Sequence, residues 1–158
     1  MDNQELNQII SSRPLLIGIG NDLRSDDGAG VILVRRIQSA GYKNTLIVGG
    51  TPENYLQKII TLPGESRLWI DAVNWGGPSG GYKIIRKEEI SHFAISTHNF
   101  SLSVITKFPN EFRPLPDLFL GIQPENMELG EKLSPPVERA IDDLVEIFTH
   151  QLGISSVC

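Results

Sequence analysis

The chain has 158 residues, of which 40% are hydrophobic and 21% charged, and its formal net charge is −5. These proportions are ordinary for a soluble globular protein, and an acidic chain without a Lys/Arg cluster is unsuited to binding nucleic acid. No apolar run is long enough to cross a bilayer, and the polar, acidic N-terminus does not resemble a secretory signal. We therefore expect one domain over residues 1–158 and cytoplasmic residence. The single cysteine, Cys158, cannot form an internal disulfide.

Two kinds of apolar segment alternate along the chain. Short continuous runs such as 15–19 favour strands that are buried on both faces, whereas the apolar spacing of 29–40 and 137–152 is typical of amphipathic helices. In chain order the predicted elements are a helix over 5–12, a strand over 15–19, a helix over 29–40, a strand over 45–48, a helix over 52–62, strands over 67–73 and 82–86, a helix over 101–108, a strand over 118–122 and a helix over 137–152.

This alternation predicts an α/β fold, namely a three-layer sandwich with a mostly parallel five-stranded sheet, one antiparallel strand and helices on both faces. The short connection NWGGPSGG, residues 74–81, indicates a hairpin between the third and fourth predicted strands and so accounts for the antiparallel strand. In such sheets ligands bind beyond the C-terminal ends of the strands. We therefore expect the functional residues in the loops that follow Ile19, Ile70 and Ile122.

The segment GIGNDLRSDDGAG, residues 18–30, places two adjacent carboxylates in a glycine-rich loop between a predicted strand and a predicted helix. It is not a dinucleotide fingerprint, because Leu23 stands where the third glycine is needed, and no Walker lysine follows. Asp26 and Asp27 suit a helix start, where a carboxylate can cap free N–H groups. One cap suffices and neighbouring like charges repel. Either both carboxylates only stabilise the helix start, or one of them caps it and the other is a ligand or acid–base group.

Two more side chains are candidates for chemistry. Asp71 ends the apolar strand Leu68-Trp69-Ile70, and His98 lies in the polar run STHNFS; the alternatives are a solvated strand end and an ordinary loop histidine. With Asp27 they form a set of two carboxylates and one imidazole, which suits a divalent metal of borderline hardness. Neither the His spacing of a zinc protease nor the nucleophile elbow of a serine hydrolase occurs. The residues alone therefore indicate only an O/N metal site on an α/β sheet.

Four motifs in the order GIGNDLRSDDGAG, LWIDAV, STHN and LFLGIQPENMELGEKLSPPVERAID carry a resemblance that covers the chain from about Leu15 to the last helix. With them the chain resembles the nickel–iron hydrogenase maturation endopeptidases, and DDGAG, PEN and THN are most similar to the formate-hydrogenlyase-type branch. The resemblance implies a hydrolase that cleaves one peptide bond and so removes the C-terminal extension of the hydrogenase large-subunit precursor after nickel insertion.

The resemblance also implies the residues of the site. The family's metal ligands correspond here to Asp27, Asp71 and His98, which we expect to engage nickel supplied by the substrate and to serve as the catalytic residues. Other divalent cations are expected to occupy the same site. Asp26 is then a helix cap or a group that orients the loop. The implied partner is the large-subunit precursor, and we expect the chain itself to be a monomer.

One position departs from the family pattern. Many members carry an Asp before the Gly-Gly that ends the second strand, where this chain has Val48, a residue that cannot act as acid, base or ligand. Either a neighbour such as Glu53 substitutes, or that Asp is dispensable here. The departure leaves open a second function, a non-catalytic module that checks nickel and binds the precursor without cutting it. A third interpretation is a scaffold whose carboxylates only cap helices.

Overall fold

The computed structural model describes residues 3–90, 94–95 and 102–155. The helices are α1 (Gln4–Ser11), α2 (Ala29–Ser39), α3 (Leu56–Thr61), α4 (Lys87–Ile90), α5 (Leu102–Phe112) and α6 (Pro135–Leu152), and two 3-10 turns are η1 (Ser25–Gly28) and η2 (Pro52–Tyr55). The strands are β1 (Leu15–Ile19), β2 (Thr45–Gly49), β3 (Arg67–Asn74), β4 (Tyr82–Ile85), β5 (Ala94–Ile95) and β6 (Asp117–Ile122). No helix in these ranges is long and apolar enough to span a membrane.

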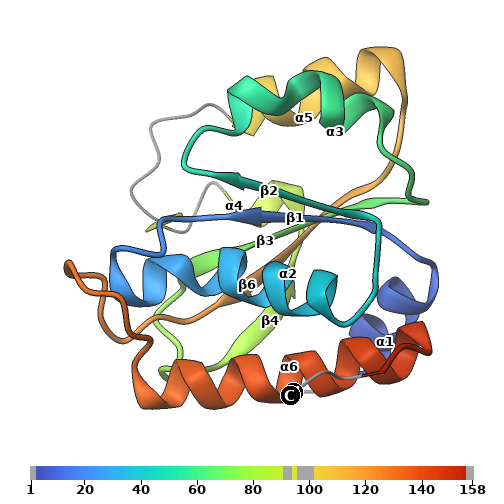
Figure 1. Ribbon diagram of the computed structural model, residues 1–158. Coiled ribbons are helices and arrows are strands. Elements are labelled where there is room, and N and C mark those ends of the chain that lie inside the picture. The colour runs from blue at the N-terminus through green and yellow to red at the C-terminus, as the bar shows by residue number, and fades with distance from the viewer. Residues whose placement is uncertain (1–2, 91–93, 96–101, 156–158) are drawn as a thin grey trace.

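The main sheet has the strand order β2-β1-β3-β6-β4. The first four of these strands run parallel, and β4 pairs antiparallel with β6. The two-residue strand β5 pairs antiparallel with the end of β3. The predicted mostly parallel sheet with an antiparallel strand is therefore confirmed, as Figure 1 shows.

The predicted hairpin between the third and fourth strands is wrong, because β6 lies between β3 and β4. The loop over 74–81 spans this gap and is held by Gln123 at the end of β6. Trp75 N–H and Gly77 N–H donate to the Gln123 side-chain oxygen at 3.0 and 3.1 Å. The main chain of Gln123 also exchanges two hydrogen bonds with Gly80 and Gly81. Gln123 therefore fastens the loop before β4 to the end of β6, the strand with which β4 pairs.

Helices cover both faces of the sheet, with α1, α2 and α6 on one side and α3 and α5 on the other (Figure 1). Successive strand residues point to opposite faces, so the central strands are apolar throughout. In β3, Leu68 and Ile70 pack toward α2 and α6, whereas Trp69 packs in the opposite layer, where its ring stacks on Phe119 at 6.3 Å. The predicted three-layer sandwich is confirmed.

Several boundaries differ from the predicted ones for local reasons. The helix predicted over 52–62 is divided into η2 and α3, and α5 continues to Phe112 although Pro109 lies inside it. The last helix begins at Pro135, since proline is compatible with the first helical turn. The short elements α4 and β5 were not predicted, because four and two residues are too few to display a period.

Arg67, at the start of β3, anchors the α3–α5 layer at the sheet edge opposite to Asp71. Its buried guanidinium donates to the carbonyls of Ile59 and Arg113 and to the side chain of Asn110 at 2.8–3.3 Å. Burial lowers the pKa of Arg67, and the Asp117 carboxylate opposes that effect. Removal of a buried cation held in this way strongly destabilises the fold, because its hydrogen-bond acceptors lose their donors.

We expect Arg67→Ala to lower the free energy of unfolding by about 2–4 kcal/mol, because one buried and one partly buried carbonyl lose the donor that Arg67 provides. Urea unfolding followed by circular dichroism measures this loss. Arg36→Ala is the matched control, since Arg36 forms an ion pair with Asp142 at the surface and its removal should change stability by about 0.5 kcal/mol or less. Equal losses in the two variants would contradict the anchoring role of Arg67.

Candidate functional site

Asp27 and Asp71 lie at the carboxyl edge of the sheet, both next to Gly20. A side-chain carbon added at Gly20 would lie 2.0 Å from the main-chain oxygen of Asp27 and 3.7 Å from Oδ1 of Asp71. Gly20 also has a φ of +135°, a conformation that favours glycine. The Asp27 carboxylate in turn accepts a hydrogen bond from Asn21 N–H at 3.1 Å. Both predicted carboxylates therefore border residues 20–21.

Asp27 has an exposed fraction of 0%, and its two oxygens differ in their surroundings. Oδ2 accepts the bond from Asn21, whereas Oδ1 is buried and accepts no hydrogen bond from any residue that the structure describes. A buried carboxylate oxygen without a donor is unfavourable in free energy unless a ligand or cation satisfies it. This oxygen is therefore suited to serve as a ligand of a bound cation.

Asp71 is 5% exposed and lies within β3, not at its end as predicted. The strand continues to Asn74, because it pairs with β6 as far as Ala72 and then with β5. Its pairing with β1 stops at Ile70, so Asp71 is the first residue of β3 beside the loop that leaves β1. Its Oδ1 accepts a hydrogen bond from Ala72 N–H at 2.8 Å.

His98, the third predicted ligand, and the motif STHN lie outside the described residues. Within the described ranges, no three His, Cys, Asp or Glu side chains lie close enough together to hold a metal ion. The structure therefore brings Asp27 and Asp71 to the same edge of the sheet and leaves the complete three-residue set as a prediction. The described strand β5, which precedes this motif in sequence, pairs with Val73 and Asn74 at that edge.

Asp26 has a different environment from its neighbour, although it too is fully buried. Its oxygens accept four hydrogen bonds: from Glu125 N–H and Asn126 N–H, both at 2.9 Å, and from the main-chain N–H and the hydroxyl of Ser134 at 2.8 and 2.7 Å. Neither η1 nor α2 has a side-chain cap within the described chain, so the prediction that Asp26 caps the helix after it is wrong. The alternative, that Asp26 orients the loop, agrees with these contacts.

The position that departs from the family pattern is part of the core. Val48 is buried in β2, among the apolar residues between the sheet and α3, and has no polar group to offer. Glu53 is exposed in η2, whereas Asp27 and Asp71 are buried, so the structure gives no support to Glu53 as a substitute.

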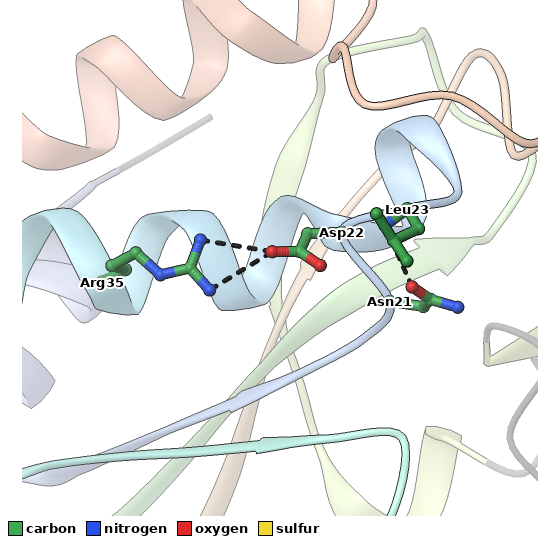
Figure 2. Close-up of polar contacts among 4 residues, drawn as sticks. All are labelled: Asn21, Asp22, Leu23 and Arg35. Atoms are coloured by element: carbon green, nitrogen blue, oxygen red, sulfur yellow. Dashed lines mark hydrogen bonds and ion pairs between the residues drawn. The ribbon is translucent and has the colours of Figure 1, made fainter.

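A cavity of about 450 Å³ opens beside the Asp27 loop. Its lining includes the glycines at the ends of β1 and β2 and three polar side chains: Gly20, Asn21, Asp22, Arg35, Gly49 and Gly50. Figure 2 shows that Arg35 extends along α2 to reach Asp22, with both guanidinium NH2 groups 3.2–3.3 Å from one carboxylate oxygen. Asn21, which lines the cavity, also donates its N–H to the Asp27 carboxylate, so the cavity adjoins the Asp27 loop. Sequence reasoning missed this cavity, since its walls come from separate segments.

Known proteins match the chain over most of its length. A family model described as hydrogenase maturation protease matches residues 31–151. The hydrogenase 3 maturation protease of Escherichia coli is 29% identical over 136 residues, which are 84% of this chain and 86% of that protein. The crystal structure of the NiFe hydrogenase maturation protease HycI from Thermococcus kodakarensis has a TM-score of 0.83 and 27% identity, covering 95% of this chain and 99% of that one. The solution structure of an endopeptidase HycI from Escherichia coli has a TM-score of 0.69 and 26% identity, covering 85% and 87%.

The two adjacent aspartates should respond in opposite ways to the same substitution. We expect Asp26→Asn to lower the free energy of unfolding by about 2–4 kcal/mol, because an amide NH2 would face N–H or O–H donors that now bind a carboxylate. Asp27→Asn should leave stability unchanged or raise it by about 1 kcal/mol, because it removes a buried charge whose Oδ1 has no donor among the described residues. Urea midpoints measure both changes. A larger loss for Asp27→Asn than for Asp26→Asn would contradict this division of roles.

Proposed function

This chain belongs to the hydrogenase maturation protease family, and from that membership we propose that it is an endopeptidase that removes the C-terminal extension of a nickel-loaded NiFe-hydrogenase large-subunit precursor. The observation that carries the proposal is the buried Oδ1 of Asp27, which has no donor among the described residues and belongs to a loop whose residues Gly20 and Asn21 line a cavity. Such a carboxylate is typical of a binding or catalytic site and not of a helix cap. We also propose that the protein acts as a monomer in the cytoplasm.

The nickel ion belongs to the substrate, and we propose that it is the signal by which a finished precursor is recognised. Carboxylate oxygens and an imidazole suit a borderline divalent ion whose remaining ligands come from another chain. Oδ1 of Asp27, which has no donor among the described residues, supports this role, as does the position of Asp71, whose Oδ1 would lie 3.7 Å from a side-chain carbon added at Gly20. His98 completes the proposed set by its place in the family motif. A precursor without nickel would leave these residues with nothing to bind and would not be cut.

The cavity has a size and lining that suit an extended peptide. Gly49 and Gly50 let another backbone approach closely, because they carry no side chain. The Asp22–Arg35 ion pair at its wall offers one group of each sign to the side chains of the bound segment. A tail lying here would pass directly beside Asp27, since residues 20 and 21 belong to both features.

Hydrolysis adds water across the peptide bond, with the hydroxyl going to the carbonyl carbon and a proton to the leaving amine. The nickel, when present in the substrate, supplies a positive charge that favours attack on the nearby carbonyl. Asp27, Asp71 and His98 are the groups proposed to hold the reacting water and to carry its proton to the amine. Asn21 N–H orients the Asp27 carboxylate. The hydrogen bonds of Asp26 fix the loop that carries Asp26 and Asp27.

A second candidate function is a module that binds the nickel-loaded precursor without cutting it. The observation that favours it is Val48, which stands in the hydrophobic core where many family members carry an aspartate. If that aspartate is needed for the hydrolytic step, the present chain would retain recognition and lose cleavage.

Incubation of the purified chain with nickel-loaded and with nickel-free precursor tests the proposal, with intact mass spectrometry as the measurement. We expect only the nickel-loaded precursor to lose the mass of its C-terminal extension. Asp27→Asn and Asp71→Asn should each slow this cleavage by about 100-fold or more. Asp142→Asn is the control, because Asp142 is a surface residue on α6, and it should cleave at the rate of the unchanged chain.

Each other outcome has a definite meaning. Binding of the precursor without a shortened product would favour the checking module. Cleavage of nickel-free precursor at the same rate would exclude nickel as the signal. Full activity after substitution of Asp27, Asp71 and His98 one at a time would show that the site has been assigned to the wrong residues.

A further inference from the structure

Two leucines are exposed to solvent on the loops beside the site. The exposed fraction is 56% for Leu23, in the loop after β1, and 79% for Leu129, in the loop after β6. The two loops are hydrogen-bonded to each other: Gly130 N–H donates to Leu23 C=O at 2.9 Å, and Arg24 and Gly130 form a parallel bridge. Leu23 directly precedes Arg24, and Leu129 directly precedes Gly130. Because the bridge is parallel, the two leucines lie opposite each other on the paired loops.

The loops that carry these leucines are held in place by several bonds. The Ser25 hydroxyl donates to Glu128 C=O at 2.8 Å, and Ser25 N–H donates to Gly130 C=O at 2.7 Å. Asp26 adds its four bonds to the same loop and to Ser134. A single exposed leucine is common, but two at paired positions on a fixed rim form an apolar surface of the kind found at protein interfaces.

Three acidic side chains lie on the loop of Leu129. Residues 125–131 contain the exposed glutamates Glu125, Glu128 and Glu131 and no Lys or Arg, and the basic residues next to this surface are Arg24 and Lys132. A complementary partner therefore presents apolar side chains flanked by basic ones. A second copy of this chain does not meet that requirement, because its corresponding surface is acidic and its net charge is −5.

The surface is continuous with the site described above. Leu23 N–H donates to the side chain of Asn21, whose own N–H holds the Asp27 carboxylate. Figure 2 shows Leu23 next to Asn21 at the start of this loop. A protein that covers Leu23 and Leu129 would therefore lie against the point at which its own tail enters the site.

We propose that Leu23 and Leu129, with the glutamates on the loop of Leu129, form the docking surface for the folded body of the precursor, which presents an apolar patch with basic side chains next to its C-terminal tail. This inference rests on the proposed function, and it adds a contact outside the cavity and the carboxylates. Docking here places the tail at the site, so it contributes to substrate affinity and not to the chemical step.

The kinetics of the double variant Leu23→Ser/Leu129→Ser with nickel-loaded precursor test this proposal. We expect KM to rise about tenfold and kcat to stay within about twofold of the unchanged chain. Glu128→Lys should also raise KM, and added salt should raise the KM of the unchanged chain, because charge attraction is screened. The matched control is Phe112→Ser, since Phe112 is 63% exposed on α5, and it should leave both constants unchanged.

The outcomes separate this inference from the function on which it rests. If the unchanged chain cuts the precursor and the double variant has the same KM, the docking surface is wrong and the function stands. An equal rise of KM in Phe112→Ser would also overturn it, as would light scattering that shows these leucines to hold two copies together. If the unchanged chain does not cut the precursor, the proposed function fails. The docking surface is then tested separately by biolayer interferometry, and equal affinities of the unchanged chain and the double variant for the precursor would overturn it.

Discussion

The site depends on one buried carboxylate that has no chemical role. Asp26 joins three segments that are remote in sequence: the loop after β1, the loop after β6 and the start of α6. A charged acceptor forms stronger hydrogen bonds than a neutral one. The Asp26 carboxylate accepts four such bonds, which fix the loop far more firmly than a single capping bond would. These bonds also hold the neighbouring Asp27 at the edge of the sheet, so the Asp27 carboxylate does not have to anchor the loop.

This arrangement explains why two adjacent aspartates occur where one cap would suffice. A single carboxylate cannot both satisfy every nearby donor and leave an oxygen available, because each oxygen bonded to the protein is less available to a ligand. The chain divides the two tasks between neighbours, so that Asp26 is saturated with donors and Asp27 keeps Oδ1 without a donor from the described residues. The sequence shows the pair but cannot show the division, since the donors lie about 100 residues away.

Most of the fold could be predicted from the sequence because its elements have strong local patterns. The continuous apolar run of β1 and the spacing of α6 each define an element with little help from the rest of the chain. The partner of β4 could not be predicted, because β6 and the Gln123 side chain that holds the loop before β4 lie far from that loop in the sequence. The cavity escaped prediction for the same reason, since Gly20 and Gly49 meet only when β1 and β2 pair.

The same reasoning bears on Val48. In this chain the end of β2 contributes apolar packing and glycine backbone to the site, and no carboxylate. Negative charge on the described part of the site is therefore concentrated in the Asp27 loop and β3, on the side of Gly20 away from β2. A group that approaches through the cavity meets glycine at the end of β2 and the paired charges of Asp22 and Arg35 elsewhere in the lining. If cleavage takes place with this asymmetry, the hydrolytic step in this protein does not require a carboxylate at position 48.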